Sequence, residues 1–198
     1  RTGREWVSPE GKSLSISVLV RPLEWSAENF GWLPLVAGVA MRQAVQEALP
    51  EREVGLKWPN DVLVEGKKIS GILSELLPGA TGVVIGAGVN LTLTKDELPI
   101  IDATSLLLEG SEISPDEFLS RYLQHLSALM KDFDNVPSQV RTNCSTIAKS
   151  VRAIFPDGNE ATGIAVGIDE SGRLLIQVSE SDQLLAVSAA DIQHLRHN

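Results

Sequence analysis

The feature that most limits what this chain can fold into is a set of four short apolar segments between residues 54 and 93. Turn signals separate these segments. Gly66 marks a tight turn between the second and third segments, and Pro78-Gly79 marks the next turn. Short apolar runs bounded in this way are typical of β-strands. The sequence therefore predicts strands at Val54–Lys57, Val62–Glu65, Lys68–Leu77 and Gly82–Leu93.

Helices are expected on both sides of this β-rich centre. Leu14–Val20 alternates as a half-buried strand, and a helix then follows over Ala27–Leu49, with Ser26 as its N-cap and an interruption at Pro34. Ser114 is the expected cap of a second helix, because Pro and two acidic residues follow it. Apolar residues then recur at spacings of three and four as far as residue 133, which indicates an amphipathic helix packed on a core.

The pattern of apolar and turn residues changes after about Ser150 and becomes typical of short strands joined by Gly-containing turns. We expect strands at Val151–Phe155, Ala161–Ile168, Leu174–Val178 and Leu184–Val187. About 50 residues of this kind predict a small β-barrel. The expected organisation is therefore an α+β domain over residues 1–149 and an all-β module over residues 150–198.

Composition excludes several classes of function. The formal net charge of -9 argues against broad contact with a nucleic-acid backbone. No apolar run approaches the roughly 20 residues that span a membrane. Cys144 is the one cysteine, which fits a reducing cytoplasm and predicts a core or half-buried thiol.

Three segments carry residues suited to chemistry. In the first, Arg1-Thr-Gly-Arg4-Glu-Trp6, two guanidinium groups and an indole suit a phosphate attached to a ring. A solvated terminus explains the same residues.

In the second segment, Lys57-Trp-Pro-Asn60-Asp61 is followed by Lys67 and Lys68, and these lysines suit a carboxylate that becomes an acyl phosphate. A purely structural Pro-Asn-Asp turn is the alternative.

The third segment is Ile85-Gly86-Ala-Gly88-Val-Asn90. A dinucleotide-binding motif is a poor interpretation, because the third glycine is absent and β character continues through Thr94. Two glycines in a strand leave room for a flat ligand, although packing in a crowded sheet also explains them.

Taken together, these segments resemble the biotin protein ligases. The strings Lys57-Trp-Pro-Asn-Asp61, Lys68-Ile-Ser-Gly71-Ile-Leu73 and Ile85-Gly-Ala-Gly-Val-Asn90 stand in the family's order, and Arg1 to Pro9 resembles the end of its biotin-binding loop. The resemblance implies a mixed β-sheet flanked by helices, similar to the class II aminoacyl-tRNA synthetase core, followed by an SH3-like barrel. It also implies that the chain begins inside that loop, so that the catalytic domain is incomplete at its N-terminus.

The resemblance implies a role for each matching residue. Lys68 and Arg1 are the expected catalytic residues, because they would neutralise the biotin carboxylate and the α-phosphate of ATP. Gly71, Leu73, Gly86 and Gly88 are expected to line the biotin slot together with them. Arg4, Trp6, Lys57, Asn60 and Asn90 are expected on the ATP side, with Asp61 at a magnesium ion. The three histidines, His125, His194 and His197, are expected to be structural.

The activity implied is ATP-dependent formation of biotinyl-5'-AMP and transfer of biotin to a lysine of a biotin carboxyl carrier domain, as in acetyl-CoA carboxylase. ATP, biotin and Mg²⁺ are the expected ligands, and a homodimer is an expected assembly. We expect no nucleic acid to bind through these residues and no membrane association. A lipoate or octanoate ligase and a non-catalytic binder or regulator remain the alternatives. The terminal module is expected to aid ATP and carrier engagement without contacting biotin.

Overall fold

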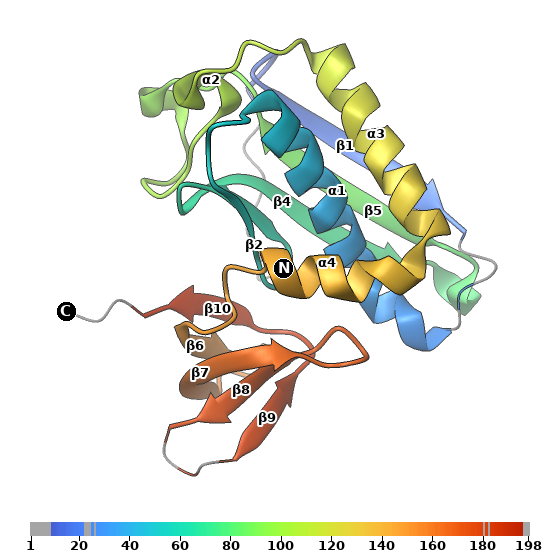
Figure 1. Ribbon diagram of the computed structural model, residues 1–198, viewed down its shortest axis with the longest axis vertical. Coiled ribbons are helices and arrows are strands. Elements are labelled where there is room, and N and C mark those ends of the chain that lie inside the picture. The colour runs from blue at the N-terminus through green and yellow to red at the C-terminus, as the bar shows by residue number, and fades with distance from the viewer. Residues whose placement is uncertain (1–8, 22–24, 26, 180, 182, 196–198) are drawn as a thin grey trace.

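The computed structural model describes residues 9–21, 25, 27–179, 181 and 183–195. Its described strands form two five-stranded sheets, and its helices pack on the first sheet (Figure 1). None of the helices in these ranges is both long and apolar enough to cross a membrane.

The first sheet has the order β1-β5-β4-β3-β2. Its ladders are all antiparallel between the described strands. Among the described residues, parallel pairing, which a mixed sheet would contain, occurs only as two isolated bridges, Leu56 with Cys144 and Lys68 with Ala103. The strands are β1 (Ser13–Val20), β2 (Val54–Lys57), β3 (Asp61–Val64), β4 (Lys67–Leu76) and β5 (Val83–Asn90). The predicted strands over residues 14–20, 54–57, 62–65 and 68–77 are confirmed to within a residue at each end.

The prediction that β character continues to Thr94 is wrong. β5 ends at Asn90, because the next two backbone N–H groups, of Leu91 and Thr92, both donate to the carbonyl of Lys12 at 3.1 and 3.0 Å. Two consecutive donors on one acceptor turn the chain out of the ladder. β-branched residues after Asn90 gave a local strand signal, and a long-range contact overrode it.

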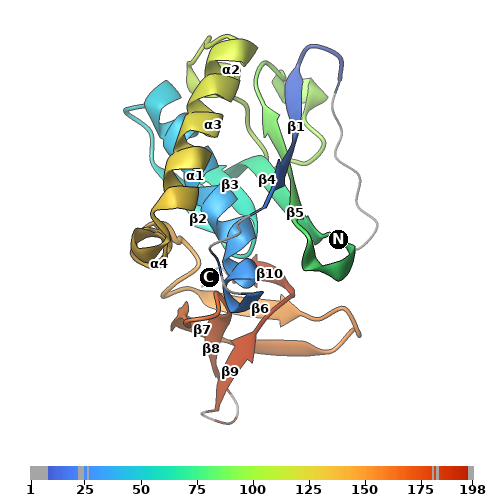
Figure 2. The ribbon, with the colours of Figure 1, turned by 90° about the vertical axis from the view of Figure 1, so that its right-hand side faces the viewer.

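The helices cover one face of this sheet (Figure 2). The predicted helix over residues 27–49 forms in two pieces, η1 (Ala27–Trp32) and α1 (Leu33–Ala48). Pro34 stands in the first turn of α1, where its missing N–H would have had no partner within the helix. Ser114 caps α3 (Pro115–Lys131) as predicted, because its hydroxyl accepts from the Glu117 N–H at 3.2 Å. Ser26 lies outside the described residues.

Several short elements were not predicted. They are the helices η2 (Pro78–Ala80), η3 (Lys95–Glu97), α2 (Leu106–Glu109), η4 (Phe133–Asn135) and α4 (Val136–Asn143), and the strand β10 (Asp191–His194). Cys144, which follows α4, is buried as expected, and this burial raises the pKa of its thiol.

The second sheet has the order β10-β6-β7-β8-β9. Its strands are β6 (Ser150–Ile154), β7 (Glu160–Ile168), β8 (Leu174–Val178), β9 (Leu184–Val187) and β10. All four predicted strands are confirmed. Within the described ranges β9 and β10 stand at opposite edges, so the expected barrel is not closed.

The segment between the two sheets is bonded to both of them. The Ser145 N–H donates to the Leu56 carbonyl in β2 at 2.7 Å, and the Ala148 N–H donates to the Ala165 carbonyl in β7 at 2.7 Å. This segment therefore fixes the second sheet against the first, beside the edge strand β2.

Two tryptophans hold the turn between β7 and β8 against the first domain. The Trp32 indole donates to the Glu170 carbonyl at 2.8 Å, and the Trp58 indole donates to the Gly172 carbonyl at 3.0 Å. The turn itself is rigid, because the Asp169 carboxylate accepts from the backbone N–H groups of Ser171 and Arg173 at 2.9 Å each. The two indoles therefore bind a preformed turn.

Candidate active site

One row of residues crosses all five strands of the first sheet. The register pairs Lys57 with Asp61, Asp61 with Gly71, Gly71 with Gly88, and Gly88 with Ser15. Directly paired residues of antiparallel strands point to the same face. The row therefore places a lysine and a carboxylate beside two glycines on the face opposite α1.

The next row on this face pairs Leu73 with Gly86 and Gly86 with Ser17. Leu73 is 41% exposed, which is unusual for a leucine in a central strand. A Cβ placed on Gly86 would meet only the Leu73 carbonyl oxygen, at 3.7 Å. The centre of the face is therefore a floor of backbone and small side chains, on which a flat ligand could lie.

A cavity of about 690 Å³ lies over this floor. The second sheet contributes one of its walls through residues of β6, the loop after it, the loop before β10 and β10 itself. These wall residues are Ile154, Pro156, Ala189, Ala190, Asp191 and Ile192. The cavity is therefore completed by both parts of the chain, and the terminal module lies closer to the site than its plain sequence indicated.

An ion pair at the cavity joins Lys68 and Asp61. Lys68 Nζ lies 2.6 Å from Asp61 Oδ1, and the two side chains are 31% and 19% exposed. The backbone of Lys68 is also fixed, because its N–H donates to Asp102 and its carbonyl accepts from Thr104, both at 2.8 Å. A lysine held by one carboxylate at a cavity can stabilise a second anion without being displaced far.

Asn60 joins the turn before β3 to the strand β4. Its side-chain nitrogen donates to the Ile72 carbonyl at 2.6 Å, and its own carbonyl accepts from the Ile72 N–H at 2.8 Å. These two bonds fix the turn between Lys57 and Asp61 beside the glycine floor. The Trp58–Pro59 peptide bond in this turn is cis.

The structure brings eight of the predicted site residues together around this cavity. They are Lys57, Asn60, Asp61, Lys68, Gly71, Leu73, Gly86 and Gly88. Asn90 is not among them: it is 3% exposed, and its side-chain nitrogen donates to the Thr104 carbonyl at 2.9 Å. The expected contact of Asn90 with adenine stays a prediction. Arg1, Arg4 and Trp6 lie outside the described residues.

Sequence reasoning missed Ser15, Ser17 and the wall formed by the second sheet. The serines alternate with apolar residues in β1, and that pattern could have placed them on the face of the glycines. The wall had no local signal, because it depends on how the two sheets pack.

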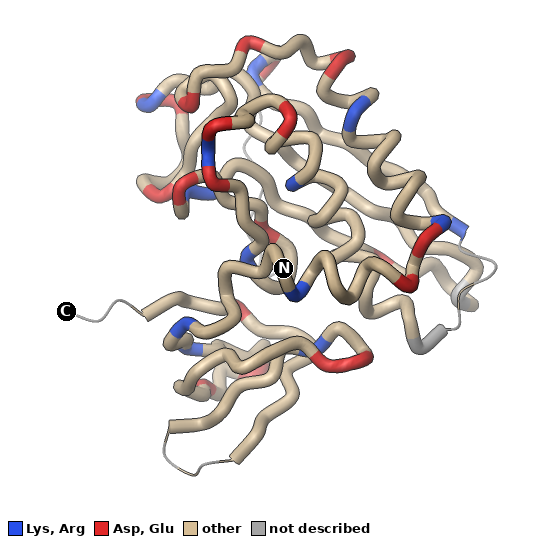
Figure 3. Tube along the Cα trace, viewed as in Figure 1, with Lys and Arg blue, Asp and Glu red and all other residues tan. Residues whose placement is uncertain are grey.

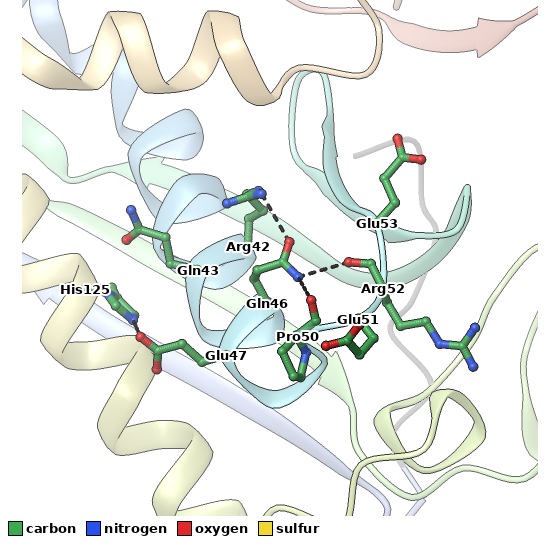
Figure 4. Close-up of a pocket in the computed structure, with 9 residues that line it drawn as sticks. All are labelled: Arg42, Gln43, Gln46, Glu47, Pro50, Glu51, Arg52, Glu53 and His125. Carbon is green, nitrogen blue, oxygen red and sulfur yellow. Dashed lines mark hydrogen bonds and ion pairs between the residues drawn. The ribbon is translucent and has the colours of Figure 1, made fainter.

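A second hollow, of about 730 Å³, lies at the end of α1 beside α3 (Figure 4). Its polar groups already bind one another. The Gln46 side chain donates to the carbonyls of Leu49 and Arg52, and Arg42 donates to the Val54 carbonyl. It contains none of the predicted site residues, and its bonds serve to end the helix.

Figure 3 shows no long run of basic residues along the described chain. Acidic and basic residues alternate along the described chain there, and acidic ones prevail over the upper part of the molecule. Positive charge at the cavity comes instead from Lys57 and Lys68.

Comparison with known proteins gives the family. The model of the Biotin/lipoate A/B protein ligase family matches residues 1–90, and that of the Biotin protein ligase C terminal domain matches residues 146–195. The chain is 39% identical to the biotin–[acetyl-CoA-carboxylase] ligase of Mycobacterium tuberculosis, over 99% of this chain and 74% of that protein. It is 32% identical to the bifunctional ligase/repressor BirA of Escherichia coli, over 89% of this chain but 57% of that protein.

Solved structures agree with these sequences. The biotin protein ligase from Aquifex aeolicus in complex with biotin and ATP superimposes with a TM-score of 0.83 at 30% identity, covering 98% of this chain and 84% of that one. The sequence matches agree with the fold and with the cavity over the glycine floor. The chain belongs to the biotin protein ligase family.

Proposed function

We propose that this protein activates biotin with ATP to biotinyl-5'-AMP and transfers biotin to a lysine of a carrier domain. The observation that carries the proposal is the pairing of Gly71 with Gly88 beneath a cavity that Lys57 and Lys68 border. The glycines leave space for a flat bicyclic ring, and the lysines supply positive charge where a carboxylate and a phosphate would meet.

The chemistry follows from charge. The biotin carboxylate and the α-phosphate of ATP repel each other, and an ammonium group between them offsets this repulsion as they approach. A carboxylate oxygen attacks the α-phosphorus, and the bond to pyrophosphate breaks. The amine of the carrier lysine then attacks the acyl carbon of the mixed anhydride, AMP leaves, and the amine loses a proton. Lys68 is the expected charge-stabilising residue in the first step, with Arg1 as its partner.

Biotin is favoured over lipoate by the terminal module. The family model that covers residues 1–90 includes both kinds of ligase, whereas the one that covers residues 146–195 is specific to biotin protein ligases. Residues 189–192 of this module line the cavity. The M. tuberculosis relative is also a biotin ligase by name.

The carboxylates that line the cavity do not form a magnesium site by themselves. They are Asp61, which is paired with Lys68, and Asp191, and no cluster of three metal-binding side chains occurs among the described residues. Protein sites for Mg²⁺ in nucleotide enzymes often use one or two carboxylates and take further ligands from phosphate and water. The proposal therefore assigns at most one ligand to Asp61 and derives no step through the ion.

The carrier domain of acetyl-CoA carboxylase is the proposed protein substrate, because the relative from M. tuberculosis is named for it. A cytoplasmic location is proposed from the reduced, buried Cys144. A homodimer stays a prediction, which sedimentation of the protein with and without biotin would test.

The experiment that tests the function uses the full-length protein and a purified carrier domain. Pyrophosphate release that depends on biotin and ATP, followed by a mass increase of one biotin on the carrier, is the expected result. Lipoate in place of biotin is the control. Thermal stabilisation by biotin and ATP without pyrophosphate release would favour a non-catalytic binder, and transfer of lipoate would favour the other ligase.

A further inference from the structure

A chain of hydrogen bonds leads from the second sheet to the turn that borders the cavity. The Trp58 backbone N–H donates to the hydroxyl of Thr146 at 3.1 Å, and the same hydroxyl lies 3.1 Å from Nε2 of His194. Thr146 is fully buried, in the segment that joins the two sheets. These two hydrogen bonds thereby link three positions that are far apart in the sequence.

The chemistry of the Thr146 hydroxyl determines which group donates in each of the two hydrogen bonds. A backbone N–H can only donate, so the Thr146 oxygen accepts from Trp58. The hydroxyl hydrogen is then available to His194, whose Nε2 accepts it when the ring proton is on Nδ1. Each group then has a partner of the right kind, which is the arrangement expected of buried polar groups.

The groups around His194 favour its neutral form. The pKa of His194 is lowered to about 4, chiefly by burial and in smaller part by the charges of Lys57 in β2 and Lys149 before β6. The thiol of Cys144, which faces Thr146 and Trp58, is kept neutral by burial. A neutral ring is the form that can accept from Thr146.

The position of Trp58 decides where the cavity residues lie. Its backbone is held by Thr146 in the joining segment, and its indole is held by the Gly172 carbonyl in the turn between β7 and β8. Lys57 precedes it, and Asp61 follows three residues later, opposite Lys57 in the hairpin. A shift of Trp58 would therefore move the charged residues on either side of it.

We propose that Thr146 and His194 are positioning residues, which set the geometry of the Lys57–Asp61 turn on the nucleotide side of the cavity through the backbone of Trp58. This inference rests on the proposed function, because that function places ATP beside the turn. The simpler possibility is that the Thr146 hydroxyl only satisfies a buried N–H. It would then affect stability and leave the kinetic constants for ATP unchanged.

Paired substitutions in the full-length protein separate these possibilities. Thr146→Val removes the hydroxyl at nearly constant shape, and Thr146→Ser restores it. His194→Leu removes the acceptor, and His194→Gln returns an acceptor oxygen. Ser145→Ala is the matched control, since that hydroxyl is in the same segment but donates to the Leu56 carbonyl at 2.8 Å.

The expected result is a KM for ATP raised about tenfold in Thr146→Val and His194→Leu, the size of effect of one lost buried hydrogen bond. Biotin affinity should change little, Thr146→Ser and His194→Gln should recover most of the loss, and Ser145→Ala should resemble the wild type. In nitrogen-15 NMR spectra, His194 should carry its proton on Nδ1, and Thr146→Val should shift the Nε2 signal.

An active wild type with unchanged KM for ATP in Thr146→Val and His194→Leu would overturn this inference alone. A proton on Nε2 of His194 would overturn the proposed direction of the hydrogen bonds and the inference with it. If the wild type released no pyrophosphate, the proposed function would fail first and this inference with it. Should Thr146→Val not fold, the two His194 variants give the same comparison.

Discussion

Lys68 and Asp61 form a 2.6 Å ion pair across two neighbouring strands, β4 and β3, at the cavity. The pair joins the residue expected to stabilise charge to the one expected at the metal. Asp61 also pairs with Gly71 in the register, so the carboxylate holds the ammonium group beside the glycine floor. A lysine held in this position is ready for an incoming anion without a large rearrangement.

The first prediction concerns this lysine. Lys68→Ala should slow biotin-dependent pyrophosphate release by a hundredfold or more, because losing one donor to a developing charge costs roughly 3 kcal/mol. Thermal stability should change little, since an ion pair that solvent still reaches contributes about 0–1 kcal/mol. Lys67→Ala removes the exposed neighbour in β4 and is the control. Wild-type pyrophosphate release by Lys68→Ala would show that its charge is not used.

The second prediction concerns the floor of the cavity. Gly86→Ala adds a methyl group that the protein accommodates, with its nearest neighbour at 3.7 Å, but that enters the proposed biotin slot. Biotin affinity measured by calorimetry should fall about tenfold or more, while the melting temperature stays within a few degrees.

Gly167→Ala is the control for Gly86→Ala. It adds the same methyl group in β7, where a Cβ would meet nothing within 4 Å, and Gly167 does not line the cavity. Equal biotin affinity in the two variants would mean that biotin does not lie over Gly86.

The third prediction concerns the turn held by the two tryptophans. Gly158 and Gly172 both have positive φ, at 85° and 79°. A Cβ on Gly158 would meet open space, whereas one on Gly172 would lie 3.4 Å from the Gly31 carbonyl, Leu35 and Trp32. Both alanine variants should lose about 1 kcal/mol from backbone strain. The methyl group on Gly172 makes contacts at the short end of the ordinary van der Waals range, so any further loss in Gly172→Ala measures how firmly the turn is held against Trp32 and Leu35. Urea unfolding of both variants measures the difference. Equal losses would show that the turn accepts the added methyl group without crowding.

Elements with a strong local pattern were predictable from the sequence. Alternation in residues 13–20, the cap at Ser114 and the Gly-containing turns of the second sheet each depend on residues close together in the chain. β10 was missed because its four residues carry no alternating apolar pattern, and its strand character comes from pairing with β6, about 40 residues earlier. Helix α4 is short and partly exposed, so its apolar pattern is weak.

The site residues also divide into those with a local sequence signal and those whose contacts are far away in the chain. Gly71, Gly86, Gly88 and the lysines were found because strand spacing and charge are visible locally. Asn90 does not line the cavity, and its side-chain amide donates to the Thr104 carbonyl, a partner that the strand pattern does not indicate. His194 was set aside as structural, since its partner Thr146 lies 48 residues earlier. Contacts of that range depend on the packing of the two sheets.

The last prediction follows from the pKa of His194, which burial lowers from 6.5 to about 4, helped by the charges of Lys57 and Lys149. The unfolded chain then binds a proton at this residue at a higher pH than the folded protein does. Its contribution to stability is therefore complete above about pH 6.5 and is lost as the pH falls towards 4. The full shift would correspond to about 3 kcal/mol, but the ring is only half-buried, so solvent screening reduces the expected loss to about 1 kcal/mol.

Carboxylates titrate in the same range, so the measurement is the difference in unfolding free energy between wild type and His194→Gln at pH 7 and pH 4.5. The wild type should lose more stability than the variant between these two values. Parallel pH profiles would show that His194 is exposed enough to titrate normally, and its hydrogen bond with Thr146 would then contribute little to the fold.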